Sequence, residues 1–235
     1  MTSASPSAAL SPAPAPRPSR RIRRSALVRL LDRGLRGHFA AQAARAVAVL
    51  LGLTYAGLVL AVALVGSGSS ADVVVQNALF WLSWLGGGGV ALAAAGPGRK
   101  PEDHAVRALA AQRGFSLRDL AMARAIATVR RVLRVVGLPA LVVALLALAA
   151  SGSFRLLLPR VLLVVGVTGY VVLLAVVISL LVELARALSP RHTRSTLAFL
   201  IVVPHLLRVL WPHVPSVPAL FGLLLDQLAR LGGAA

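Results

Sequence analysis

Residues able to do acid–base, nucleophilic or metal chemistry are few in this chain, and they are scattered. There is no cysteine, which excludes disulfides, thiolate metal sites and cysteine nucleophiles. The histidines lie in different segments, and no pair has the spacing of metal ligands: His38, His104, His192, His205 and His213. The patterns HExxH, GxSxG and GxxxxGK(S/T) do not occur. We therefore expect no catalytic residue, no metal site and no bound cofactor, and no nucleotide hydrolysis by the chain itself.

One carboxylate, that of Glu183, stands at the end of a long apolar segment and three residues before Arg186. A carboxylate inside a membrane can serve as a proton relay. At the end of a helix and beside an arginine, however, it more often forms an interfacial ion pair. Of these two roles we expect the ion pair.

The most informative stretch is PEDHAVRALAAQRGFSLRDLAMAR, residues 101–124. Pro101 suits the first position of a helix, and Glu102 and Asp103 place negative charge near the positive end of its dipole. Apolar residues recur on one face, and Gly114 can take the left-handed conformation that ends a helix. The pattern predicts a short amphipathic helix over 101–113. Its apolar surface is too small for a core helix, so we expect it to lie against a partner protein or a membrane surface.

A second helix is predicted directly after the first. Ser116 precedes Asp119 by three residues, which is the spacing of a capping box with aspartate in place of the usual glutamate or glutamine. This helix should begin at about Leu117 and continue into the apolar stretch that follows. The two helices together form a corner, residues 101–124, and Pro139 should kink the second one near its entry into the bilayer.

The hydrophobic composition of the chain indicates a membrane protein. Of 235 residues, 58% are hydrophobic and 14% are charged, and the mean hydropathy is +0.83, so we expect an integral membrane protein with an all-α, polytopic helical bundle. The formal net charge is +18, but the arginines collect at the ends of apolar runs, where anionic lipid accounts for them better than nucleic acid does. Lys100 is the single lysine among 25 basic residues, which is typical of a GC-rich bacterial genome.

The apolar runs predict about five spans and three interfacial helices. Residues 1–19 are rich in proline and small residues, and we expect a disordered cytoplasmic tail. The predicted spans are 46–66, 73–96, 135–151, 161–182 and 196–211, and the predicted interfacial helices are 24–38, 101–113 and 219–231. In the second span, Gly86 to Gly89 should form a packing face or a local break.

The basic residues predict the orientation. Three segments, 17–45, 99–134 and 186–194, hold 21 of the 25 arginine and lysine residues. Because basic residues concentrate in cytoplasmic loops, the amino terminus and the corner should be cytoplasmic. We expect a multi-pass protein of the bacterial inner membrane.

The order of these segments resembles the membrane subunits of export-type ATP-binding-cassette (ABC) transporters. A basic amphipathic helix, two spans, a cytoplasmic amphipathic helix within VRALAAQRGFSLRDLAMARAIA and a long basic helix entering the third span all occur in that order. In that family the helix between spans two and three couples to the ATPase. The resemblance implies that the coupling role falls on Glu102, Asp103, Arg107, Leu109, Arg113 and Gly114. The segment WPHVPSVPALFGLLLDQLARLGG is similar to the family's outer re-entrant element, but the sequence lacks an evident sixth span.

The resemblance also implies the partners. The expected function is that of a permease subunit of an ABC-type exporter, working as a homodimer or with a second permease and driven by a separate ATP-binding subunit. The alternative is a non-transporting membrane scaffold that recruits a partner through the same corner. An intramembrane enzyme acting on lipid is the weakest interpretation, because no nucleophile, metal cluster or carboxylate pair is visible. We expect the lipid bilayer as a partner and no nucleic acid.

Overall fold

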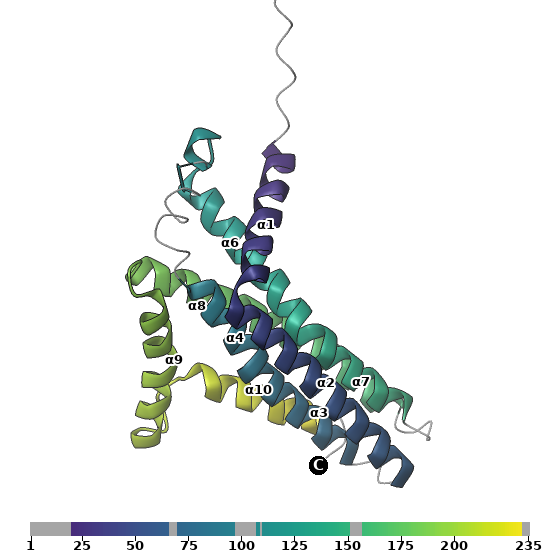
Figure 1. Ribbon diagram of the computed structural model, residues 1–235. Helices are drawn as coiled ribbons and strands as arrows, with labels where there is room; N and C mark the ends of the chain where they lie inside the picture. Colours follow the sequence, from purple (N-terminus) through teal and green to yellow (C-terminus); the bar gives the residue numbers. More distant parts are fainter. Residues whose placement is uncertain (1–19, 66–69, 97–106, 109, 151–156, 232–235) are drawn as a thin grey trace, which may run out of the picture.

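The computed structural model describes residues 20–65, 70–96, 107–108, 110–150 and 157–231. The elements in these ranges are all helical, which confirms the predicted fold class (Figure 1). In chain order they are α1 (Arg20–Gly37), α2 (Phe39–Val65), α3 (Ser70–Trp81), η1 (Leu82–Gly87), α4 (Gly88–Ala95), α6 (Leu117–Val132), η2 (Leu133–Gly137), α7 (Leu138–Ala149), α8 (Leu157–Leu188), α9 (Thr193–Leu210) and α10 (Val217–Leu231), where η1 and η2 are π-helical.

Four helices in the described part of the chain are long and apolar enough to cross a membrane. They are Phe39–Val65, Ala71–Ala95, Leu117–Ala149 and Leu157–Leu188, and they overlap the first four predicted spans. The second consists of α3, η1 and α4 in series, and the third of α6, η2 and α7. The fifth predicted span, 196–211, corresponds to α9, which is not one of these four and whose crossing stays a prediction.

Small residues allow the spans to approach each other closely, as is usual for helices in membranes. A Cβ atom added at Gly52 of α2 would lie 2.8 Å from the Cβ atom of Pro139 in α7. A Cβ atom added at Gly86 of η1 would lie 3.2 Å from Val136 in η2. The glycine tetrad is thus a packing face, as one of the two interpretations predicted.

The same tetrad also coincides with a break in the α-helical pattern. The π-helical segment η1 ends at Gly87, and η2 lies directly before Pro139 in the neighbouring span. Proline has no backbone N–H and its ring crowds the preceding turn, so an irregular turn before Pro139 has a local cause. The two π-helical segments contact each other. Both spans therefore leave regular α-helical geometry at the same place.

The amino-terminal helix α1 packs on α6. Its Val28, with Leu31 and Leu35, lies against Ala123 and Ala127 of α6. The sequence predicts an interfacial helix over 24–38. The structure shows that most of the apolar face of this helix packs on α6, while Leu30 remains 56% exposed.

Chain reversals gather at two ends of the bundle. The beginning of α9 lies near the ends of α4 and α8, and α1 crosses α6 on the same side, with the beginning of α6 extending beyond the bundle (Figure 1). We call this side the basic end, because Arg131 lies within electrostatic range of Arg36, Arg45 and Arg134, and Arg186 bonds to the last turn of α4. The end of α7 and the beginnings of α3 and α8 lie at the opposite end.

The last helix, α10, packs against the bundle. Phe221, Leu225 and Leu228 are buried, and α10 contacts α3 and α8. The sequence predicts an interfacial helix over 219–231. The structure gives this helix an apolar contact face on the spans, and Gln76 of α3 donates a hydrogen bond of 3.3 Å to Asp226.

Candidate functional site

The corner has the helix end that the sequence predicted. Residues 110–112 are helical, and Gly114 has a φ angle of +72°. The N–H of Gly114 donates to the carbonyl of Ala111 at 2.9 Å, and the N–H of Phe115 donates to that of Ala110 at 2.9 Å. This pair of bonds is a Schellman motif, in which the left-handed residue lets the last carbonyls of the helix find donors. The prediction that Gly114 ends the helix is confirmed.

The second helix begins with the predicted capping box. The Ser116 hydroxyl accepts a bond of 3.1 Å from the N–H of Asp119, and the Asp119 carboxylate accepts from the N–H of Ser116 at 3.2 Å. The carboxylate also accepts from the Ser116 hydroxyl at 2.8 Å. The box fixes the direction in which α6 leaves the corner, because it satisfies donors on both residues. Only Phe115 and Ser116 separate Gly114 from Leu117, the first residue of α6.

The structure places half of the predicted coupling residues. Arg107, Arg113 and Gly114 are exposed. Glu102, Asp103 and Leu109 lie outside the described residues. The two exposed arginines lie on either side of the last helical residues before the turn at Gly114. Their exposure leaves room for a partner but does not by itself show that one binds there.

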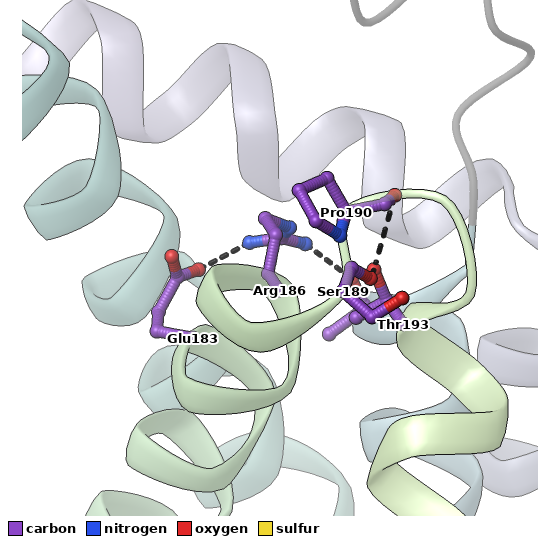
Figure 2. Close-up of polar contacts among 6 residues, drawn as sticks. Glu183, Arg186, Ser189, Pro190 and Thr193 are labelled. Atoms are coloured by element: carbon purple, nitrogen blue, oxygen red, sulfur yellow. Dashed lines mark hydrogen bonds and ion pairs between the residues drawn. The ribbon is translucent and has the colours of Figure 1, made fainter.

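At the basic end, α8 is held to α4 by the pair that the sequence singled out. Arg186 forms an ion pair with Glu183 and also donates a bond of 2.7 Å to the carbonyl of Ala94 in the last turn of α4 (Figure 2). A cation at the end of a helix is favourable, because the carbonyls there lack helical partners. The predicted ion pair is confirmed, and Arg186 additionally caps α4.

Two more contacts join α9 to this end of the bundle. The Thr193 hydroxyl donates to the carbonyl of Ser189 at 3.2 Å, which closes the turn between α8 and α9 (Figure 2). Arg194 lies 3.0 Å from the Nε2 atom of His38, between α1 and α2. The ends of helices from both halves of the chain are therefore connected near the segment that leads into the corner.

An apolar cavity of about 110 Å³ lies between the spans and α10. Its polar element is the contact of 3.0 Å between the hydroxyls of Ser83 in η1 and Tyr170 in α8. The ring of Phe221 from α10 meets the Tyr170 ring edge to face, with centroids 5.4 Å apart. Such a lining suits an apolar group with one hydrogen-bonding atom. The sequence analysis missed this cavity, although a tyrosine within an apolar run was a visible signal.

A buried charged pair was also missed. Asp72 in the first turn of α3 is 4% exposed, and Arg160 of α8 is 2% exposed. The guanidinium of Arg160 interacts electrostatically with the Asp72 carboxylate and donates a bond of 2.7 Å to the carbonyl of Ala147 at the end of α7. Asp72 and Arg160 each stand one residue before a predicted span, 73–96 and 161–182. Arg160 therefore bonds α8 to the end of α7, with the Asp72 carboxylate of α3 within electrostatic range.

The described ranges contain no group of three histidine, aspartate or glutamate side chains that could hold a metal ion. No protein-family model, no curated protein and no solved structure matches the chain. Four helices that are long and apolar enough to cross a bilayer define a multi-pass helical membrane protein. The function must therefore be inferred from the corner and from the helices attached to it.

Proposed function

We propose that this protein is a permease subunit of an ABC-type exporter in the bacterial inner membrane, with its amino terminus in the cytoplasm. On this proposal a separate ATP-binding subunit docks on residues 102–114. The observation that carries the proposal is the direct connection between that surface and a span: the Schellman turn at Gly114 is followed at once by the capped helix that continues from Leu117 to Ala149.

This connection gives a route by which a docked partner moves the membrane part. A force on the corner reaches α6 through two residues, Phe115 and Ser116, and the bonds of the capping box resist fraying there. α6 contacts α1 and α8, and η2 contacts η1 in the neighbouring span. Movement of the third span would therefore displace residues at the glycine tetrad and beside the cavity lined by Ser83 and Tyr170.

We also propose that the exporter contains a second permease, either another copy or a different chain. The cavity between the spans and α10 holds about 110 Å³, which suits a small apolar group rather than a continuous path across the bilayer. A path formed between two permeases removes this limitation, and the exposed apolar faces of α2 and α8 are available for the contact.

Substitution at Gly114 tests the proposal. At a φ angle of +72° a valine is strained, so Gly114→Val should alter the angle between the two helices of the corner while leaving Arg107 and Arg113 in place. The partner should still bind, but its ATPase rate should no longer respond to this subunit. Gly114→Asn is the matched control, because asparagine tolerates the left-handed conformation.

The measurement is the ATPase rate of the co-purified partner, reconstituted with wild type, with each variant and without this subunit. Stimulation by wild type and by Gly114→Asn, but not by Gly114→Val, supports the exporter. A partner that binds this corner and has no ATPase activity would instead identify a membrane scaffold. An ATPase rate that is the same in all four samples would exclude coupling.

A further inference from the structure

A groove at the basic end combines positive charge with apolar surface. It encloses about 650 Å³ and lies where α1, α2 and α6 meet. Its basic side is formed by Arg36 of α1, Arg45 of α2 and Arg131 of α6, and its apolar side by Val49 and Leu50 of α2. Three helices therefore contribute one arginine each to a single concave surface.

The charges around the groove do not balance within the described part of the chain. Arg131 interacts electrostatically with three further arginines, Arg36, Arg45 and Arg134, and with one carboxylate, that of Asp32. Asp32 accepts bonds from Arg134 at 2.9 Å and from Arg36 at 3.4 Å. Four arginines against one aspartate leave an excess of three positive charges. An anionic ligand would reduce their mutual repulsion.

The burial of Arg131 points to the same conclusion. Its side chain lines the groove although the residue is only 4% exposed, and its Nε atom has no hydrogen-bond partner. An unpaired donor on a buried charged group is unfavourable, because the group has lost water without gaining an acceptor. Arg131 therefore brings an incompletely paired charge to the wall of the groove, and a phosphate there would offset that charge.

The apolar side of the groove continues along the outside of α2. Val49, Leu50 and Leu53 are 47%, 64% and 67% exposed and follow one another on one face of the helix. They extend from the arginines toward the middle of a helix that is long enough to cross the bilayer. A ligand that fits both parts has an anionic head and a hydrocarbon tail.

We propose that this groove binds one anionic phospholipid of the leaflet at the basic end. Its phosphate lies among Arg36, Arg45 and Arg131, and an acyl chain lies on Val49, Leu50 and Leu53. Gln42 at the rim of the groove can bond to the polar head. Basic pockets between spans at the cytoplasmic side are suited to such headgroups. The proposal requires only that the protein spans a membrane and does not depend on the exporter function.

Binding in this place would join three helices. Arg36, Arg45 and Arg131 belong to α1, α2 and α6, so a phosphate shared among them acts as a bridge at the basic end. A ligand that binds the folded protein alone stabilises it in proportion to the logarithm of its concentration. We therefore expect anionic lipid to raise the thermal unfolding midpoint of the protein.

The test uses the purified full chain in a neutral detergent, titrated with dioctanoyl phosphatidylglycerol. The unfolding midpoint should rise with this lipid and not with dioctanoyl phosphatidylcholine, which has no net charge. Inorganic phosphate and glycerol 3-phosphate should have no effect at the same concentrations, because they lack the acyl chain. If these soluble anions raised the unfolding midpoint equally, the ligand of the groove would be a free phosphate and not a lipid. If phosphatidylcholine raised the midpoint equally, the groove would not recognise the charge of the lipid.

Matched variants locate the effect. Arg36→Gln with Arg45→Gln should weaken the apparent affinity for phosphatidylglycerol roughly 25-fold, from about 1 kcal/mol for each basic side chain. The control is Arg33→Gln with Arg130→Gln, which removes the same charge from exposed positions of α1 and α6 that do not line the groove. The control should bind as the wild type does. An equal loss in both pairs would show a general response to charge and overturn the site.

Discussion

Gly89 of α4 lies so close to Ala44 of α2 that a Cβ atom added at Gly89 would be 2.5 Å from the Cβ atom of Ala44. The neighbouring position, Gly88, has no other atom within 4 Å of such a Cβ. Two adjacent glycines of one helix therefore differ in function. Gly89 allows the first two spans to touch, whereas Gly88 leaves open space next to it.

This difference gives a matched pair of substitutions. Gly89→Ala should destabilise the protein by about 1–3 kcal/mol, because the alanine at position 44 is short and cannot turn aside, so the helices must separate. Gly88→Ala should be neutral or stabilise by up to about 1 kcal/mol, because alanine favours a helix more than glycine does. Thermal unfolding midpoints in one detergent measure both. Equal midpoints for the two variants would contradict the close contact.

The buried groups of Asp72 and Arg160 should contribute strongly to the stability of the fold. Arg160→Leu removes the donor to the carbonyl of Ala147 and leaves the Asp72 carboxylate without its cation, and the Oδ1 atom of that carboxylate already has no hydrogen-bond partner. Breaking one half of a buried pair costs about 3–5 kcal/mol. The loss should appear as a large drop in the unfolding midpoint, while Arg191→Leu, at an exposed position, should change it little.

Adding Asp72→Asn to Arg160→Leu separates two causes of that loss. If the main penalty is the uncompensated charge, the double variant should regain part of the lost stability, because asparagine carries no charge. A double variant less stable than Arg160→Leu alone would mean that the Asp72 carboxylate is stabilised by other groups.

Local and distant features of this protein differ in how well sequence predicts them. The capping box of Ser116 and Asp119 and the turn at Gly114 could be predicted, because their bonds join residues at most five positions apart. The bond between Asp32 and Arg134 spans 102 positions, and no pattern in either segment marks the other. The groove with Arg36, Arg45 and Arg131 depends on such long-range packing. From the sequence alone, these arginines could only be assigned to the basic segments 17–45 and 99–134.

The amino-terminal helix shows the same limit for apolar faces. The spacing of Leu27, Leu30, Leu31 and Leu35 predicts an amphipathic helix, and the structure leaves Leu30 of that set 56% exposed. Periodicity shows that one face of a helix is apolar but does not show what covers that face. Lipid and another helix can bury an apolar face equally well. In the structure the other three leucines pack with Val28 against α6. Only the three-dimensional arrangement decides between the two.

Removing the helix cap at Ser116 should loosen the start of α6. In Ser116→Ala the N–H of Asp119 loses its acceptor, at a cost of about 1 kcal/mol. Hydrogen exchange at the amides of Asp119 and Leu120, which bond to Ser116, should then be about fivefold faster, while exchange in α7 should not change. Ser116→Thr keeps a hydroxyl at this position and is the control. Unchanged exchange in Ser116→Ala would mean that tertiary contacts hold this turn without the cap.

The orientation of the protein in its membrane is the last prediction, and the absence of cysteine makes it simple to test. Single cysteines introduced as Ser69→Cys, Gln112→Cys and Ala235→Cys each provide one reactive thiol without background. Because 21 of the 25 basic residues lie in segments 17–45, 99–134 and 186–194, position 69 should be outside and position 112 inside. An impermeant maleimide added to whole cells should therefore label position 69, and label position 112 only after lysis.

If α9 crosses and α10 does not, position 235 should be labelled from outside as well. Labelling of position 235 only after lysis would require an even number of crossings, and inside labelling of position 69 would reverse the proposed orientation.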